Sequence, residues 1–552
     1  MVREEIKNLI EKAVRNLYRK EVEVKIERPA EMAYGDYATN VAMTLTKNPQ
    51  EIADFIKYRA KRGEEEDEVL FAPPILEKVE VKNGFINFFL SKEYLQKQVE
   101  EILKQEDKFG QLKIGRHPPT THGQKAQVEF ISANPTGPLH LGHGRGAFFG
   151  DTISNVLEKA GYKVTREYYI NDAKVNTQIK TLGQTALGEG VTYLNDYLKE
   201  KISNLKSKLE KISDEGEAGY LLAQEVQKDN KDFIGKKLKI KFDNWVSEND
   251  LYKINKVNKI YNWLKNENLI YKKEGAEWLK TSQFGDKQDW VIIRETGEPT
   301  YLLSDIAYHR DKFKRGFQKI INIWGADHQG HVGKIKAVAK ILNYKWDLDI
   351  LISQVVRLKG GKISKRKGVV VTLEWLINEV GLDATRFFYL MKSLDTQMEF
   401  DVGLAKERSA KSPVYYVQYA YARIHSILAK SKINHSPFPM GWVAQPFNKG
   451  CGKNQKSKVD YKLLNHPSEL ELIKQLIRFP ETVEDTAKDY QIQRLPQYAI
   501  DLATVFHQFY RDCQVLTEVK PLREARLALI LATRTVLKNT LNVMGISAPE
   551  HM

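Results

Sequence analysis

The chain has 552 residues, more than one hydrophobic core usually organises, so we expect two to four domains. Hydrophobic residues make up 42% and charged residues 28% of the sequence, values that exclude a disordered chain, a collagen-like repeat and a disulfide scaffold. An excess of 86 Lys and Arg over 71 Asp and Glu makes nucleic acid the natural partner, with a merely solvated lysine-rich surface as the alternative.

The N-terminal residues and the cysteines indicate in which cellular compartment the protein is expected. The first 20 residues are amphipathic, but Glu4, Glu5 and Glu11 fit neither a secretory signal nor an acid-poor transit peptide. No apolar run is long enough to span a bilayer, so we expect no membrane partner. Cys451 and Cys513 are the only cysteines and lack the neighbouring ligands of a structural zinc site. We expect a cytoplasmic protein without a metal site of its own.

Residues 1–120 predict a small α+β domain. An opening helix is followed by a polar turn at 35–37 and by an alternating segment, 79–90, whose central Lys-Asn-Gly turn indicates a hairpin. Pro118 and Pro119 then fix φ and remove two backbone donors, so neither a helix nor a central strand can continue there. We place a domain boundary near residue 120.

Residues 121–400 alternate short apolar strands with helices, the pattern of a parallel sheet with crossover helices. A lysine-rich helical insertion is expected near 180–250. The helix after the first strand ends at Gly161 and has one apolar face, formed by Phe149, Ile153, Val156, Leu157 and Ala160. The expected strands are 127–131, 163–170, 320–324 and 348–358.

Residues 401–552 predict an all-α domain. One apolar face at helical spacing consists of Val414, Val417, Tyr421, Ile424 and Leu428. The stretch 431–460 interrupts this region with prolines, glycines and lysines, and it is longer than compact domains usually tolerate in a loop. Its sequence leaves its role open.

A first site motif, His140-Leu141-Gly142-His143, lies between the first strand of the sheet and its helix. A helix N-terminus offers unpaired N–H groups and a positive dipole end, and glycines let a phosphate approach the backbone. His140 and His143, three residues apart, would project from one helical face toward that anion. The alternative for either residue alone is a structural histidine.

The same stretch also satisfies G-x-G-x-x-A through Gly142, Gly144 and Ala147, with Glu167 twenty residues on. This pattern keeps a dinucleotide-binding interpretation open. That interpretation leaves Asn134 and both histidines without a role.

A second motif, 359–368, contains five cations and three glycines, directly after an expected strand. Such a loop can close over a polyphosphate and neutralise charge as it develops, whereas a solvated basic loop is the alternative. A Walker A loop is excluded because Gly361-Lys362 is followed by Ile363 and preceded, five residues earlier, by Val356.

Together, 140–143 and 362–366 resemble the two nucleotide-binding signatures of class I aminoacyl-tRNA synthetases, in the right order. The segments 133–138, 415–420 and 544–552 are similar to arginyl-tRNA synthetases in particular, and 35–41 looks like that family's N-terminal tRNA-binding domain. Ile363 stands where the family usually has Met. The resemblance covers nearly the whole chain and implies a Rossmann-like α/β catalytic domain over 121–400, with an all-α anticodon-binding domain over 401–552.

The resemblance implies that ATP and L-arginine react to an adenylate, whose arginyl group then passes to the terminal adenosine of tRNA(Arg). A guanidinium requires carboxylates placed for bidentate contact, for which Glu129 and Asp305 are the candidates. Alternatively, Glu129 caps a strand and Tyr301 belongs to the core. The arginine-binding residues are predicted to be Glu129, Asn134, His140, Tyr301, Asp305 and Gln329.

ATP-binding residues are predicted to be Pro138, His140, Gly142, His143, Gly325, Asp327, His328, Lys362, Ser364 and Lys365, with His140, His143, Lys362 and Lys365 as the catalytic groups. Mg²⁺ would accompany ATP. For tRNA we name Tyr415, Tyr416, Tyr419 and Arg423, although aromatic stripes on helices also build cores. The family resemblance further implies a monomer in which tRNA binds before arginine is activated.

Three other functions stay open at this point. A class I synthetase for another amino acid would need no guanidinium-binding carboxylates. A nonenzymatic RNA-binding paralogue would not need both signatures intact. A nucleotidyltransferase acting on a small acid would leave the N-terminal and C-terminal regions without a function.

Overall fold

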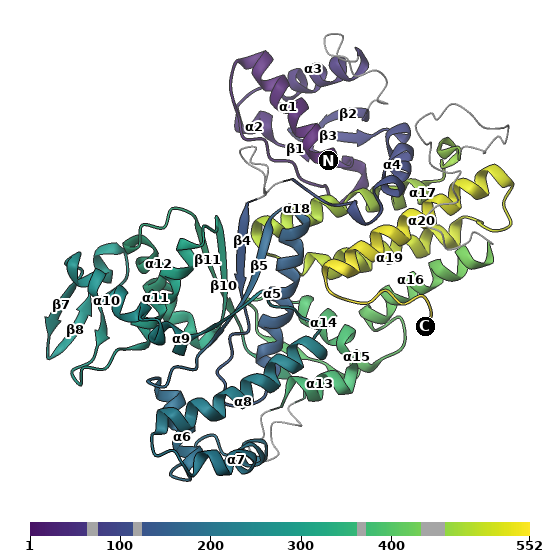
Figure 1. Ribbon diagram of the computed structural model, residues 1–552. Coiled ribbons are helices and arrows are strands. Elements are labelled where there is room, and N and C mark those ends of the chain that lie inside the picture. Colours follow the sequence, from purple (N-terminus) through teal and green to yellow (C-terminus); the bar gives the residue numbers. More distant parts are fainter. Residues whose placement is uncertain (63–74, 114–123, 361–370, 432–458) are drawn as a thin grey trace, which may run out of the picture.

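The computed structural model describes residues 1–62, 75–113, 124–360, 371–431 and 459–552. Within them, a five-stranded sheet with its helices lies beside a smaller N-terminal sheet and a set of C-terminal helices (Figure 1). The boundary predicted near 120, the cations of the second motif from Lys362 onward and most of 431–460 lie outside these ranges.

The N-terminal part is an antiparallel sheet in the order β1-β3-β2 packed against helices. The predicted hairpin is confirmed: Asn83 and Gly84 form its two-residue turn with φ values of 53° and 81°, as a type I′ turn requires. Gly35 has φ +84°, and a Cβ there would lie 2.7 Å from the Phe88 carbonyl oxygen. The elements are α1 (Val2–Tyr18), η1 (Met32–Tyr34), β1 (Tyr37–Thr39), α2 (Val41–Thr44), α3 (Pro49–Arg62), β2 (Leu76–Lys82), β3 (Phe85–Leu90), α4 (Lys92–Gln105) and η2 (Glu106–Lys108).

The central sheet is parallel throughout, as predicted, and its strand order is β11-β10-β4-β5-β6. From β4 the chain adds β5 and β6 on one side and β10 and β11 on the other, so the order reverses between β4 and β10. Ligands of open α/β sheets bind outside the carboxyl ends of the strands at such a reversal. The strands are β4 (Lys125–Glu129), β5 (Lys163–Ile170), β6 (Asn244–Ser247), β10 (Lys319–Gly325) and β11 (Asp347–Ser353).

Two local predictions were wrong. The segment 348–358 is not one strand: the chain leaves β11 at Ser353, and β12 (Val356–Leu358) pairs instead with β13 (Met398–Phe400) in a separate sheet. The insertion is not helical to residue 250 either. Its end forms β6, which extends the central sheet because Trp245 stacks on Tyr168 of β5 at 4.5 Å between ring centroids.

Helix α5 (Leu141–Lys159) crosses from β4 to β5 and packs on the sheet (Figure 1). The insertion helices α6 (Thr177–Leu187), α7 (Asp196–Leu209) and α8 (Glu215–Lys236) enclose a small core of their own, in which Leu205 and Leu209 are buried and Ile202 and Ile212 are partly buried. A further group comprises α9 (Glu248–Lys253), α10 (Lys256–Asn266), β7 (Ile270–Lys273), β8 (Ala276–Leu279), η3 (Thr281–Phe284), β9 (Trp290–Ile293), α11 (Tyr301–Lys314), η4 (Ala326–His331) and α12 (Val332–Ile341).

After β13 the described chain is helical, and the predicted apolar face is confirmed, since Val414, Val417, Tyr421, Ile424 and Leu428 are all buried. The helices are α13 (Leu373–Val380) and α14 (Leu382–Leu390) before β13, then α15 (Val402–Lys406), α16 (Pro413–Lys430), η5 (Tyr461–Leu463), α17 (Pro467–Ile477), α18 (Phe479–Asp489), α19 (Arg494–Asp512) and α20 (Lys520–Val543).

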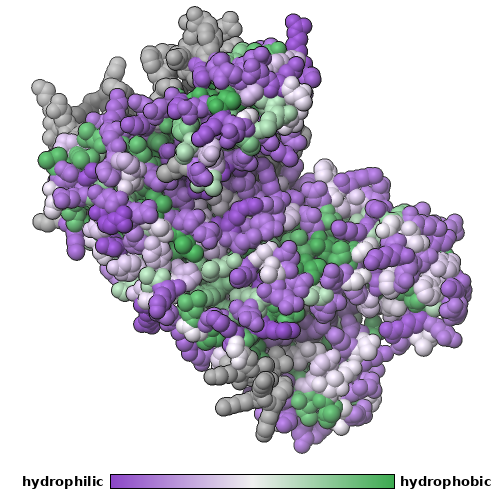
Figure 2. Space-filling model, turned by 180° about the vertical axis from the view of Figure 1, so that it is seen from behind, coloured by the Kyte–Doolittle hydropathy of each residue, from purple (hydrophilic) through white to green (hydrophobic). Residues whose placement is uncertain are grey.

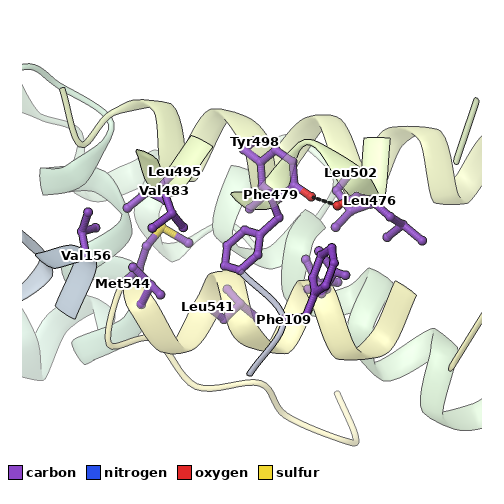
Figure 3. Close-up of a cluster of buried hydrophobic side chains, with 14 of the residues drawn as sticks. Phe109, Val156, Leu476, Phe479, Val483, Leu495, Tyr498, Leu502, Leu541 and Met544 are labelled. Atoms are coloured by element: carbon purple, nitrogen blue, oxygen red, sulfur yellow. Dashed lines mark hydrogen bonds between the residues drawn. The ribbon is translucent and has the colours of Figure 1, made fainter. Parts of the chain in front are cut away.

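One continuous core joins the C-terminal helices to the rest of the chain. Figure 3 shows Phe109, from the segment after α4, and Val156 of α5 gathered with side chains of α18, α19 and α20. Phe109 stacks on Phe479, and the Tyr498 hydroxyl donates to the Leu476 carbonyl at 3.4 Å. Hydrophilic residues cover most of the face in Figure 2, with apolar patches between them. No described helix is long and apolar enough to cross a membrane.

Candidate active site

His140 and His143 stand at the N-terminus of α5, at the carboxyl end of the central sheet. His140 is the N-cap residue, and its Nδ1 accepts the backbone N–H of Gly142 at 3.0 Å. The Nδ1 of His143 accepts the backbone N–H of His140 at 3.1 Å, and the two rings stack at 3.8 Å. The predicted placement of both histidines on one face is confirmed.

These hydrogen bonds determine what the histidines can do. Burial lowers the pKa of His140, opposed by the charge of Asp327, and burial with the neighbouring ring lowers the pKa of His143 to about 3. Both rings are therefore neutral at physiological pH. Because each Nδ1 accepts a backbone N–H, the ring proton lies on Nε2. The helix end thus presents two uncharged Nε2–H donors.

Two segments flank this helix end. Leu141 N donates to Val371 O and Leu373 N to Leu139 O, so the residues that follow the second motif are joined directly to the first motif. Gly325 ends β10, the strand adjacent to β4, and Asp327, His328 and Gln329 follow it in η4; all four residues are exposed. Pro138 is exposed just before His140. The structure brings these predicted residues to one end of the sheet, whereas Lys362, Ser364 and Lys365 lie outside the described residues.

A buried polar row crosses the same sheet. The register aligns Asn322 of β10 with Glu129 of β4, Glu129 with Glu167 of β5, and Glu167 with Asn244 of β6. Side chains in register on adjacent strands point to the same face. Two carboxylates thus lie side by side in the interior, where each needs a cationic partner.

Helix α11 supplies the partners. Tyr301, Asp305, Tyr308 and Lys312 recur at spacings of four, three and four residues, which places them on one helix face. Lys312, fully buried, forms an ion pair with Glu129 and donates to Asn322 at 2.8 Å. The single hydrogen of the Tyr308 hydroxyl is shared between Glu167 Oε1, at 2.6 Å, and Glu129 Oε2, at 3.0 Å.

Glu129 is therefore not merely a strand cap, and its chief partner was missed from the sequence. Lys312 Nζ and Tyr308 both contact Oε2, whereas Oε1 receives only a long hydrogen bond of 3.3 Å from Ser132 among the described residues. The spacing of Lys312 from Tyr301 and Asp305 was the signal that could have revealed it.

Asp305 differs from Glu129 in having no partner. Its carboxylate makes no ion pair or hydrogen bond with any residue in the described ranges. Burial, followed by the charges of Glu248 and Glu129, raises its pKa well above the ordinary value, while Lys312 and Lys334 oppose that shift. A cation beside Asp305 would relieve this repulsion.

Tyr301 lies one turn before Asp305 and is 47% exposed, so it is not a core residue. Lys334 Nζ donates to its hydroxyl at 3.3 Å and lies 3.4 Å from the centre of the Trp290 ring. Burial lowers the pKa of Lys334, opposed by Asp286 and Asp305. At the other side of the site, Asn134 Oδ1 accepts the Asn171 amide at 2.9 Å.

The structure excludes the dinucleotide-binding interpretation, because that interpretation requires Glu167 to reach a ribose. This residue is fully buried and accepts two hydrogen bonds from Arg315, at 2.5 and 2.9 Å, besides one from Asn244 at 2.6 Å. Burial alone would raise its pKa, but the bonds and charges of Arg315 and Lys312 outweigh burial and lower it to about 2. Glu167 is a structural carboxylate without access to a ribose.

The candidate tRNA-binding residues lie together on α16. Tyr415 and Tyr419 stack at 6.2 Å, with Tyr419 41% exposed, and Tyr416 contacts His507 of α19. The Arg423 guanidinium lies 4.8 Å from the centre of the Tyr510 ring. Exposed aromatic rings with a cation beside them can stack on unpaired bases.

Three family models match the chain. "Arginyl tRNA synthetase N terminal domain" matches residues 4–90, "tRNA synthetases class I (R), catalytic domain" matches 98–182 and 194–393, and "DALR anticodon binding domain" matches 417–552.

Similar whole proteins and structures agree with these matches. The chain is 39% identical to an arginine–tRNA ligase of Carboxydothermus hydrogenoformans, over 96% of this chain and 95% of that one. It is 40% identical to an arginine–tRNA ligase of Moorella thermoacetica, over 96% and 93%. Among solved structures, Thermus thermophilus arginyl-tRNA synthetase shares the fold with a TM-score of 0.75 at 22% identity, with both chains fully covered.

Proposed function

The chain belongs to the arginyl-tRNA synthetase family of class I, and from that membership we propose how its residues share the reaction. The enzyme activates L-arginine with ATP and transfers the arginyl group to the 3′-terminal adenosine of tRNA, releasing pyrophosphate and AMP. The observation that carries the assignment of roles is the partnerless Asp305 carboxylate at the same end of the sheet as His140 and His143.

We propose that the guanidinium of arginine binds Asp305 and the free oxygen of Glu129, with Tyr301 beside it. A planar fork of N–H donors fits two such carboxylates, and a neutral side chain would leave both unpaired. Asn134, His140 and Gln329 hold the ammonium and carboxylate end, which points toward the helix. Such a site rejects wrong amino acids by the cost of the unpaired carboxylates.

ATP would bind with its phosphates at the N-terminus of α5. The Nε2–H groups of His140 and His143 donate to phosphate oxygens, and backbone N–H groups with the helix dipole add to the attraction. Gly142 is required there because a Cβ would lie 2.9 Å from the His140 ring. The exposed residues completing this assignment are Pro138, Gly325, Asp327 and His328.

In the activation step the arginine carboxylate attacks the α-phosphorus, and the bond to pyrophosphate breaks. The chain positions the two reactants and stabilises the charge that grows on the leaving group. We assign that second task to Lys362 and Lys365, with Ser364, on the family signature. Mg²⁺ would accompany ATP; the hard oxygens of the triphosphate, with Asp327 near His140, suit that ion, which screens the phosphate charge.

For tRNA, we assign anticodon contacts to Tyr415, Tyr416, Tyr419 and Arg423, on the grounds of exposure and ring stacking. We further propose that the domains span 1–120, 121–400 and 401–552, that the enzyme is a cytoplasmic monomer, and that it requires tRNA(Arg) for the activation step.

The decisive experiment is ATP–pyrophosphate exchange with each of the twenty amino acids, with and without total tRNA. We expect exchange with arginine alone, and only when tRNA is present. Exchange with arginine in the absence of tRNA would refute the tRNA requirement and keep the substrate. Exchange with another amino acid would overturn the proposed arginine site.

A further inference from the structure

We propose that Lys312 is a positioning residue for arginine: it holds one oxygen of Glu129 so that the other oxygen, together with Asp305, faces the guanidinium. The proposal rests on the arginine site proposed above. It assigns a role in substrate binding to a residue that would itself touch Glu129 and not the arginine.

The two carboxylate oxygens of Glu129 have different contacts. Oε2 receives Lys312 Nζ and the Tyr308 hydroxyl, whereas Oε1 has only the 3.3 Å contact with Ser132. Lys312 cannot swing away easily, because Asn322 accepts a second of its hydrogens and the ring of Tyr308 lies 4.4 Å from Nζ. The carboxylate plane is therefore fixed before arginine arrives.

Charge balance also requires Lys312. Glu167 is matched by Arg315, so Lys312 is the ammonium group that contacts Glu129, whereas Asp305, whose pKa is raised, has no such contact among the described residues. Without Lys312, Glu129 would lose its ion pair, and a buried carboxylate without a cation takes up a proton.

In Lys312→Met the proton would go to Glu129, because Lys312 contacts Glu129 Oε2 directly and acts on Asp305 only through its charge. Other titratable groups around the pair are already engaged: Arg315 holds Glu167, and His309 is bonded through Nδ1 to the Asp305 carbonyl and through Nε2 to Asn322. Glu248 accepts hydrogen bonds from Ser304 and Asn176. Tyr169 and Tyr308 stack at 4.3 Å, and burial raises the pKa of both hydroxyls far from neutrality.

The test is the pH dependence of the arginine KM in aminoacylation, between pH 6 and pH 8, for the unaltered enzyme and for Lys312→Met. In the variant, protonated Glu129 would offer no charge to the guanidinium, so we expect the arginine KM to rise by about tenfold for each pH unit below the midpoint of that titration. The unaltered enzyme should give a flat profile, and the ATP KM should stay flat in both.

Three further variants separate the proposal from a structural effect. Lys312→Arg keeps the cation and should keep the arginine KM flat with pH. The double variant Glu129→Gln with Lys312→Met removes the titrating carboxyl, so the slope should vanish. Lys256→Met breaks the ion pair with Asp311, also on α11 but half-exposed, and should leave the arginine KM unchanged.

A flat arginine profile in Lys312→Met, or a slope that persists in the double variant, would overturn the proposal. If Lys312→Met does not fold, an arginine KM that rises toward low pH in Lys312→Arg or in the double variant would also overturn the proposal. Failure of the arginine site itself looks different: Asp305→Ala would then leave the arginine KM unchanged.

Discussion

The two ends of the site treat charge in opposite ways. The arginine end, built by Glu129, Asp305 and Lys312, pairs the Glu129 carboxylate with a buried ammonium group and leaves the Asp305 carboxylate without a partner among the described residues. The ATP end presents the neutral rings of His140 and His143, which offer N–H donors. The arginine end can discriminate strongly, because a wrong ligand leaves these carboxylates unmatched. The ATP end can release its product, because these neutral donors add no fixed positive charge to the phosphate site.

The largest effect is expected from a substitution that disrupts the arginine end. Asp305→Ala removes the carboxylate of the proposed arginine site that has no partner among the described residues, and kcat/KM for arginine should fall by roughly 10³-fold, or about 4 kcal/mol. The ATP KM should change little, because Asp305 lies at the other end of the site. Steady-state aminoacylation with each substrate varied in turn measures both constants.

A matched control lies on the same helix. Asp311→Ala removes a half-exposed carboxylate that is paired with Lys256 and, at 3.6 Å, with Arg315, and it should leave both constants within about twofold. Equal losses for arginine and ATP in Asp305→Ala would place Asp305 outside the arginine site and would remove the distinction between the two ends.

The ATP end can be broken by His140→Ala, for which the chain offers a close control. His140 and His466 are both N-cap histidines with a capping box, on α5 and α17. Either substitution should cost about 1 kcal/mol of stability through the lost cap. Only His140→Ala also loses a donor to the triphosphate, so its kcat should fall by about 10²-fold while His466→Ala keeps full activity.

The pH dependence of the ATP KM tests whether the two histidine rings bind phosphate in the neutral form. Since the pKa of His143 is about 3, its ring gains no proton between pH 8 and pH 6, and the pKa of His140 lies below the ordinary 6.5. The ATP KM of the unaltered enzyme should therefore be flat over that range. A tightening of ATP binding below pH 6.5 would mean that the rings bind phosphate as cations.

How much was predictable depends on the distance along the chain between interacting residues. The placement of His140 and His143 followed from a local pattern, a strand, glycines and then a helix. Lys312 was missed because its partner lies 183 residues away: its spacing from Tyr301 and Asp305 places it on their helix face, but this spacing does not point to Glu129. The split between β11 and β12 was missed for the same reason, since the apolar run of 348–358 does not reveal that its pairing partner changes from β10 to β13.

The smallest effect concerns the support of the arginine end. Glu167→Gln weakens the buried bond to Arg315 and should lower the free energy of unfolding by about 2 kcal/mol at pH 7, measured by urea unfolding followed by tryptophan fluorescence. Glu158→Gln is the control, because Glu158 binds Arg166 at the surface, and this substitution should change the free energy of unfolding by less than about 0.5 kcal/mol.

The folded-state pKa of Glu167, about 2, lies below its ordinary 4.5, so its stabilisation is complete above pH 4.5 and is lost as the pH falls toward 2. The difference between Glu167→Gln and the unaltered enzyme should therefore shrink over that range. A difference independent of pH would mean that Glu167 contributes by packing and not by charge, and the arginine end would then rest on one buried ion pair instead of two.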